Sequence, residues 1–443
     1  MNTIGLIFTF VAGAFLISLP RRAAAIPLLM GAAYVTRNPV LEIGPASFTV
    51  IRVLVLIGFL RVLMKGEKIR HGLNRTDLFL ALWGLLLLGS GFFHTSDSWA
   101  FRAGMVWSEL GCYFLFRIFI QDHEDLNRLY KALCVFMVPI AMLMLFEKIT
   151  GTNPFSIMGD VTEISEVRQG HTRARGPFNH PILAGTVGAT CFAIALSMWR
   201  SQRKHAFMGL GAGFAIVLAS TSSGPVMMVF FILFGLGLWR LRRYLNAIRW
   251  FVVVVIIALD ATMTDPVYFL VARIDIAGGS TGWHRAELIR SSIEHLDEWW
   301  LLGTDYTRHW MPTGIPANTR HTDITNHLLT LGVMGGLPLM LSFVMATAAG
   351  FRMVGFALRE NEDTSAEHSF LIWTLGAILF GHVVNFFSIV LYDQSVTFFY
   401  LILAGIGAVR AVKPSTAAGI AEPRERFSYA QHVYRAGRSD SPA

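Results

Sequence analysis

Two segments that lie far apart in the chain carry the side chains with the clearest chemistry. Arg173 and Arg175 belong to the sequence Arg-Ala-Arg-Gly-Pro-Phe-Asn-His-Pro, which ends at Pro181 directly before an apolar stretch. His321 stands at the start of another apolar stretch, ahead of a glycine-rich run. A guanidinium group binds phosphate oxygens through paired hydrogen bonds, and a neutral imidazole accepts a proton from a hydroxyl. If both segments face one side of a membrane, these residue types predict a site for a diphosphate-linked substrate.

The residues from Asn179 to Pro181 have the pattern of a helix start. Proline is favoured at the first helical position, and asparagine is a good cap just before it. A helix that begins here would present the positive end of its dipole to the loop of Arg173 and Arg175, which favours an anion. His180 lies in the same turn and is a candidate supporting residue. The alternative is a loop whose arginines contact lipid headgroups or only fix the topology.

A third candidate cation, Arg285, lies in a segment with helical periodicity between Trp283 and Trp300. At about 100° per residue, the apolar side chains of this segment fall on one stripe. The stripe contains Leu288, Ile289, Ile293, Leu296 and Trp300. Arg285 is in line with that stripe, where an unpaired charge is costly. We therefore expect Arg285 to bind a phosphate, and the alternative is that it reaches solvent from the helix end.

His321 is the candidate general base. If a helix begins at His321, the helix dipole disfavours the cationic imidazole, which leaves a neutral ring that can take a proton. His327 and Asn326 lie one to two turns further along and are competing candidates. The glycines at 332, 335 and 336 also let helices approach closely, which is the alternative explanation for this motif.

Ionisable side chains also occur inside apolar stretches. Arg52 and Arg102 lie near the ends of two such stretches, and Glu109 follows on the same helical face as Arg102. Such residues usually face the interior of a helix bundle and are functional candidates. For the two arginines, snorkelling to the membrane surface is the alternative. Histidines and carboxylates show no ligand spacing, so the sequence predicts neither a metal site nor a cofactor.

The composition indicates that a membrane positions these residues. Of 443 residues, 54% are hydrophobic and 15% are charged, which is too apolar for a soluble protein of this length. Stretches near the length needed to cross a bilayer recur along the chain. They lie near 4–18, 23–35, 48–64, 77–93, 99–120, 129–146, 180–198, 206–220, 224–239, 250–264, 325–348, 369–388 and 396–411. The predicted fold is all-α, a polytopic membrane protein of about 12–13 transmembrane helices within residues 1–413.

The charge pattern predicts the topology. Arginines and lysines follow alternate stretches, as cytoplasmic loops require, so the net charge of +8 gives no signal for nucleic-acid binding. The connections 147–179 and 265–324 then lie on the periplasmic side. Residues 414–443 form a polar cytoplasmic tail that we expect to be disordered. The three cysteines all fall inside apolar stretches, which favours neither disulfides nor zinc.

Three motifs together resemble the O-antigen ligase and O-antigen polymerase superfamily of bacterial envelope glycan enzymes. That family typically has Arg-x-x-Gly-Pro/Thr-Phe-x-x-Pro before a mid-chain span, which matches Arg173 to Pro181. It has an arginine in the large periplasmic loop, usually after glycine, where this chain has His284-Arg285. It has histidine followed by an amide or serine, nine residues and Gly-x-x-Gly, where this chain has His321-Thr322 and Gly332 to Gly335. The likeness covers roughly residues 170–340.

The resemblance implies a GT-C-like fold in the bacterial inner membrane and glycosyl transfer at its periplasmic face. The donor would be a glycan on a polyprenyl diphosphate, held by Arg173, Arg175 and Arg285. His321 would activate the acceptor hydroxyl, and attack opposite the diphosphate would invert the anomeric centre without a metal. The acceptor, which could be a glycan, a lipid or a protein, separates ligase from polymerase and is left open.

A transporter or flippase of lipid-linked glycans is the competing class of function. Such a protein should show paired half-repeats, broken helices and charges at mid-membrane. The chain instead gathers its charges in two unequal loops without a visible repeat. This distribution favours an enzyme.

Overall fold

Helices make up most of the chain, as the apolar periodicity predicts. The computed structural model describes residues 3–37, 40–44, 46–70, 72–95, 99–273, 282–361 and 366–409. Its α-helices are α1 Thr3–Ser18, α2 Ala25–Tyr34, α3 Val50–Lys65, α4 Arg75–Ser90, α5 Trp99–Phe119, α6 His123–Thr150, α7 Pro181–Ser197, α8 Arg203–Ser220, α9 Ser223–Gly237, α10 Leu245–Thr262, α11 Gly282–Glu294, α12 Leu296–Trp299, α13 His327–Glu360, α14 Ala366–Asn385 and α15 Val396–Ala408. Residues Met1–Arg410 form one unit and Ala411–Ala443 another. The predicted disordered tail, 414–443, lies outside the described residues.

Each of the thirteen apolar stretches contains a helix. Five helical segments of the described chain are long and apolar enough to cross a membrane, which indicates a membrane protein. They are Arg75–Phe93, His123–Thr150, Ser223–Thr262, His327–Glu360 and Ala366–Asn385. The ten residues of α2 span about 15 Å, which is shorter than a bilayer core. The total of 12–13 spans therefore stays a prediction.

Two short β-hairpins interrupt the helical architecture, and the all-α prediction missed both. The strands β1 (Val40–Ile43) and β2 (Ala46–Thr49) pair antiparallel before α3. The strands β3 (Glu166–Arg168) and β4 (His171–Arg173) pair before α7. The turn between β3 and β4 has positive φ at Gln169 and Gly170, as tight hairpin turns require. This second hairpin carries Arg173 at its end.

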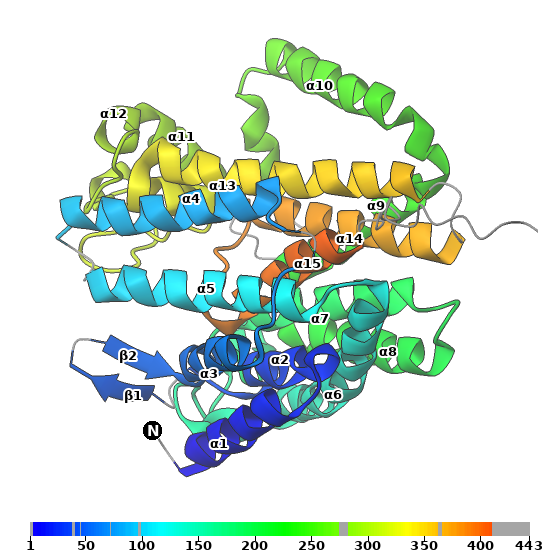
Figure 1. Ribbon diagram of the computed structural model, residues 1–443. Coiled ribbons are helices and arrows are strands. Elements are labelled where there is room, and N and C mark those ends of the chain that lie inside the picture. The colour runs from blue at the N-terminus through cyan, green and yellow to red at the C-terminus, as the bar shows by residue number, and fades with distance from the viewer. Residues whose placement is uncertain are drawn as a thin grey trace, which may run out of the picture. The chain divides into compact units, whose positions relative to one another are not determined.

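Helix α7 lies at the centre of the bundle and is buried along most of its length (Figure 1). It packs against α8, α9 and α14. Glycines permit the closest of these contacts, because a Cβ on Gly213 would lie 2.6 Å from the carbonyl oxygen of Gly188 and from the amide of Phe192. Close packing of backbone against backbone therefore fixes the position of α7. The end of the loop that leads into α7 is fixed with it.

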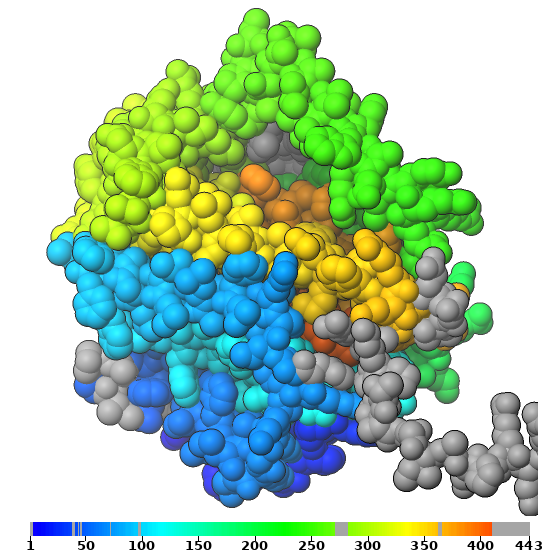
Figure 2. All heavy atoms as spheres, turned by 45° about the horizontal axis from the view of Figure 1, so that its top comes forward, coloured from blue at the N-terminus to red at the C-terminus, as the bar shows by residue number. Residues whose placement is uncertain are grey.

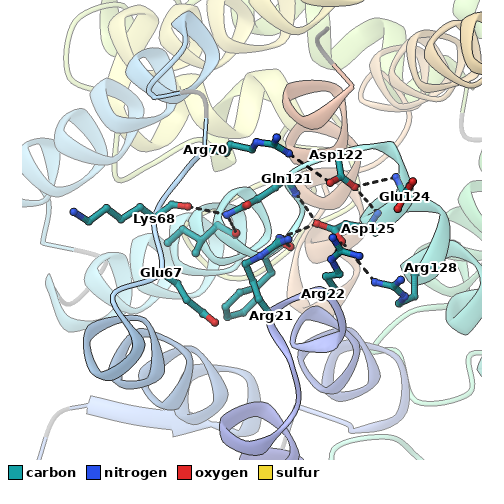
Figure 3. A network of polar contacts seen from close by, with 12 residues as sticks. Arg21, Arg22, Glu67, Lys68, Arg70, Gln121, Asp122, Glu124, Asp125 and Arg128 are labelled. Carbon is teal, nitrogen blue, oxygen red and sulfur yellow. Dashed lines mark hydrogen bonds and ion pairs between the residues drawn. The ribbon is translucent and has the colours of Figure 1, made fainter. Parts of the chain in front are cut away.

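One end of the bundle is held by a polar network (Figure 3). Arg21 donates to the carbonyl of Phe119 at 2.6 Å and to Asp125 at 2.7 Å. Gln121 donates to the carbonyl of Lys68 at 3.0 Å. These contacts join the connections α1–α2, α3–α4 and α5–α6 at the same end, the one predicted to be cytoplasmic.

Helix α13 is interrupted at the glycine-rich run. Gly335 and Gly336 have non-helical dihedral angles, with φ of 74° at Gly336. A Cβ on Gly336 would collide with the carbonyl of Leu301, and a Cβ on Gly303 would collide with the carbonyl of Val333. Gly336 thus permits contact with the segment that follows α12, while Gly332 packs on Trp299 of α12 and Gly335 lies against Ser90 of α4, so close approach of helices also explains this run.

Partners from outside α13 satisfy the backbone groups that this interruption frees. Loop 299–304 exchanges two backbone hydrogen bonds with α13, Thr304 N to Val333 O at 2.9 Å and Leu337 N to Trp300 O at 2.7 Å. Arg102, which is 1% exposed, donates to the carbonyl of Met334 at 2.7 Å. The break is therefore closed by protein groups.

The amphipathic segment forms a helix, but its buried face is not the predicted stripe. α11 ends at Glu294, and the short α12 follows. The buried face of α11 includes His284, Leu288 and Ser291, whereas Ile293 and Trp300 are exposed. The prediction of one apolar stripe to Trp300 is wrong, because the chain bends at His295 and ends the helical periodicity there.

Helix α10 stands apart from the bundle, with none of its residues buried. Figure 2 shows it raised above α13, over a hollow. A groove lined by residues of α9, α10, α13 and α14 runs beneath it. This groove lies apart from the loops that carry the candidate residues.

Candidate functional site

The loop that carries Arg173 and Arg175 is anchored on α6 by one buried carboxylate. Glu147 accepts hydrogen bonds from the backbone amides of Arg175 at 3.1 Å and Gly176 at 2.8 Å. Ser165 also donates to Glu147, at 2.8 Å. Gly176 takes a φ of 57°, which glycine adopts without strain. The loop therefore reaches the start of α7 in a defined conformation.

His180, not Asn179, caps α7. The Nδ1 atom of His180 accepts a hydrogen bond from the amide of Ile182 at 3.2 Å, and Pro181 takes the first helical position. Burial and the nearby charge of Arg173 lower the pKa of His180 to about 4. His180 is therefore neutral near pH 7, and its supporting role is to hold the helix start.

Arg173 and Arg175 flank this helix start, and each has an unused donor. Arg173 is 4% exposed, pairs with Glu166 at 2.9 Å and donates to Ser222 at 3.0 Å. Arg175 donates to the carbonyl of Asn179 at 3.4 Å. The Nε atoms of both arginines are buried and have no hydrogen-bond partner among the residues that the structure describes.

Arg285 on α11 approaches the same loop. Its side chain is half-buried, and burial together with the charge of Arg168 lowers its pKa. The Nε atom of Arg285 is also buried and lacks a partner in the described part of the chain. The structure thus brings together the two loops that the sequence separates by more than a hundred residues.

Arg168 was not predicted as a site residue. It lies on β3, and its charge acts on both His180 and Arg285. Its place only five residues before Arg173 in the same arginine-containing loop was the available signal. Arg168, Arg173, Arg175 and Arg285 are called the arginine cluster below.

The arginine cluster has the chemistry of an anion site. Buried N–H groups without partners are costly, and like charges at close range add to that cost. A diphosphate would relieve both, because its oxygens accept charge-assisted hydrogen bonds and its charge opposes that of the guanidinium groups. The N-terminus of α7 lies at the same place and adds a favourable dipole.

His321 lies in a loop and does not begin a helix, so the prediction of a helix start there is wrong. α13 starts at His327, and Asn326 is its cap, accepting from the amide of Leu329 at 3.1 Å. A helix dipole therefore does not keep His321 neutral. Instead, the Nδ1 atom of His321 lies 3.1 Å from the hydroxyl of Thr307, which orients the ring.

The competing histidine, His327, is enclosed by the core. Its ring lies 5.1 Å from the ring of Phe343 and 4.9 Å from that of Phe386. Its backbone amide donates to the carbonyl of Phe386 at 2.8 Å. This packing indicates a structural role for His327.

One contact ties the loop of His321 to α11. The ring of His284, the neighbour of Arg285, forms a hydrogen bond with the carbonyl of Asp323 at 2.8 Å. The resembled family usually has glycine at the position of His284, and this hydrogen bond explains structurally why a histidine is present.

The pKa of Tyr392 is raised by burial and by the charge of Asp393, and it is also affected by the charges of Asp323 and Arg175. Charges from both loops therefore act on Tyr392.

The remaining candidates divide between two places. Arg52 and Glu109 line a cavity of about 150 Å³ together with Tyr392 and Asp393. Arg52 donates to Ser108 at 3.1 Å, and Tyr400 donates to Glu109 at 2.9 Å. Arg102 closes the break in α13, so its position has a structural explanation.

No protein-family model and no curated protein matches the chain. Any assignment of function therefore rests on the residues and their geometry.

Proposed function

We propose that the protein is a glycosyltransferase of the bacterial inner membrane. It would move a glycan from a polyprenyl-diphosphate donor to an acceptor hydroxyl at the periplasmic face, as O-antigen ligases and surface polysaccharide polymerases do. The observation that carries the proposal is the arginine cluster. Arg173 and Arg175 before α7, and Arg285 on α11, each have a buried Nε donor without a partner among the described residues. That arrangement suits a diphosphate that serves as both anchor and leaving group.

In the proposed reaction the protein needs no metal at the diphosphate. The arginine cluster binds the diphosphate and offsets the charge that develops as its bond to the sugar breaks. The His321 ring, oriented through Nδ1 by Thr307, accepts the proton of the attacking hydroxyl. Attack from the face opposite the diphosphate inverts the anomeric carbon. The proton ends on His321, and the polyprenyl diphosphate leaves.

One observation favours the competing transporter function, namely the broken helix α13. Transporters use such breaks to offer free backbone groups to a substrate. Here loop 299–304 and Arg102 take those groups, which argues against a substrate site at the break. An enzyme remains the better-supported proposal.

The proposed orientation can be tested at Leu301. This side chain is 48% exposed and lies in the loop after α12. We expect a cysteine at Leu301, in a variant without the buried Cys112, Cys134 and Cys191, to react with a membrane-impermeant thiol reagent when only the outer membrane is permeabilised. If labelling requires a broken inner membrane, this loop and the site lie on the cytoplasmic side, which would contradict the proposed orientation.

The diphosphate site can be tested by binding to the purified protein. We expect a short-chain polyprenyl diphosphate to bind more tightly than the corresponding polyprenol, with an affinity that falls as salt rises, because charge-assisted contacts dominate. Arg285→Ala should remove most of this difference. Equal binding of the diphosphate and the uncharged alcohol would contradict the proposal.

A further inference from the structure

The outer loop between α11 and α13 contains a second cluster of reactive side chains, separate from the arginine cluster. His295 follows α11, Glu298 lies on α12, and His309 lies on the short helix η6 (Arg308–Trp310). One ligand-type atom from each of the three side chains lies within 4.8 Å of the others. Folding therefore assembles an imidazole–carboxylate–imidazole triad that residue spacing did not reveal.

Hydrogen bonds hold His295 and Glu298 from outside the triad, and Glu298 also contacts His309. The Nδ1 atom of His295 lies 2.8 Å from the carbonyl of Ser291, which can only accept, so Nδ1 donates there and Nε2 is the ring nitrogen left for an ion. The indole of Trp310 donates to one oxygen of Glu298 at 2.9 Å, and the other oxygen lies 2.8 Å from Nε2 of His309. Metal-binding histidines and carboxylates are oriented by outer contacts of this kind.

Aromatic rings fix the same side chains from the sides. The ring of Tyr306 stacks on that of His309 at 5.1 Å, with an interplanar angle of 3°. The ring of His295 stacks on Trp310 at 5.8 Å. The side chains of His309 and Glu298 are 38% and 31% exposed, so an ion could reach them from solvent. The triad is therefore both preorganised and accessible.

We propose that His295, Glu298 and His309 bind one divalent transition-metal ion, with Zn²⁺ as the favoured ion. Two imidazoles and a carboxylate form a known three-ligand set for zinc, with water in the fourth position. Tetrahedral zinc at about 2.1 Å from each ligand places the ligand atoms about 3.4 Å apart. The His309–Glu298 pair, at 2.8 Å, would open slightly to reach that spacing, and all three ligand atoms already lie within 4.8 Å of one another.

The ion would act on the structure of the loop and not on the diphosphate. His309 lies two residues after Thr307, the residue that orients His321. The backbone amides of Thr307 and Arg308 both donate to the carbonyl of Arg320, at 3.0 and 2.9 Å, which joins this segment to the residue before His321. A metal that fixes η6 to α12 therefore stabilises the support of His321. This inference goes beyond the proposed glycosyl transfer and does not depend on it.

The test is zinc binding by the purified full chain, prepared with an affinity tag that contains no histidine. After treatment with a chelator and dialysis, we expect the protein to take up one Zn²⁺ per chain and its Tm to rise. Co²⁺ in place of Zn²⁺ should give the visible absorption of a four-coordinate site. His295→Ala and His309→Ala should each weaken zinc binding by more than about 100-fold and remove the Tm increase.

Two further variants separate ligand loss from misfolding. Glu298→Gln retains the size of the side chain and an oxygen that can accept from Trp310, so it should fold, yet bind zinc more weakly. Glu294→Gln is the matched control, because Glu294 is exposed and, among the described residues, pairs with Arg290, at 3.0 Å, outside the triad. This variant should bind zinc normally. Binding of the polyprenyl diphosphate should survive chelation, which distinguishes this site from the arginine cluster. Failure of the wild type to bind zinc, or normal binding by His295→Ala, would overturn the inference.

Discussion

Replacing Arg285 with alanine is expected to lower glycan transfer by at least about 10²–10³-fold, the loss typical when one donor to a developing anion is removed. Arg285 is half-buried beside Arg168, and its Nε has no partner in the described part of the chain. A side chain whose buried Nε has no partner among the described residues gains most from a bound diphosphate. The measurement is the transfer rate of the purified variant, together with its level in the membrane and its Tm.

Two variants on the same helix serve as controls. Arg285→Lys keeps the charge but loses the paired donors, so it should restore activity only in part. Arg290→Ala removes an exposed arginine that pairs with Glu294 at 3.0 Å, and it should transfer at a normal rate. Normal transfer by Arg285→Ala would remove this arginine from the mechanism. Arg173→Ala should also lose transfer. Because this substitution breaks the ion pair with Glu166, its Tm must be measured to show that the variant is folded.

Replacing His321 with alanine is expected to lower transfer by about 10²–10⁴-fold, the usual contribution of a general base. Binding of the polyprenyl diphosphate should not change, because the arginine cluster is intact. Thr307→Val should reduce kcat and shift the pH profile while leaving the KM for the donor unchanged, since Thr307 only orients the ring. The measurements are steady-state kinetics over a range of pH and diphosphate binding for each variant.

His327→Ala is the matched control for this prediction. The ring of His327 packs against Phe343 and Phe386, so its loss should lower the Tm by leaving a cavity. The fraction that folds should still transfer glycan at close to the normal rate. If His327→Ala is inactive when folded and His321→Ala is active, the assignment of the base is wrong.

The positions of the helices were predictable because long apolar stretches have few alternatives to helix in a membrane protein. Arg173, Arg175 and Arg285 could be singled out because charged residues next to such stretches are costly without a function. Arg173 and Arg175 lie in the loop before α7, and the charge of Arg168 in the same loop also acts on Arg285 of α11. The like charges of Arg168 and Arg285 repel each other, so the fold imposes their approach and the sequence does not predict it.

The errors have local physical causes. The start of α13 was placed six residues too early because the mostly polar residues 321–325 form a loop, and Asn326 caps the helix that follows them. The stripe on α11 was extended to Trp300 because the bend at His295 has no strong sequence signal. The break in α13 requires glycine at 336 for contact with Leu301, a residue on another segment.

The triad of His295, Glu298 and His309 shows a further limit. Its first two members lie three residues apart, which is ordinary on a helix surface. The third comes from η6, and only the fold of the segment between α11 and α13 brings it to the others. Sequence spacing therefore predicted that the chain has no metal site, whereas the geometry supports one.

The central claim is that the arginine cluster serves glycosyl transfer from a diphosphate carrier rather than transport of the carrier. The direct test uses the purified protein in liposomes that contain a polyprenyl-diphosphate glycan with an isotopic label in the sugar, and a lipid extract of the source membrane as acceptor. We expect the label to leave its carrier, polyprenyl diphosphate to appear in equal amount, and Arg285→Ala to show neither change. Movement of the label across the bilayer while still joined to its carrier, with no polyprenyl diphosphate released, would contradict the account.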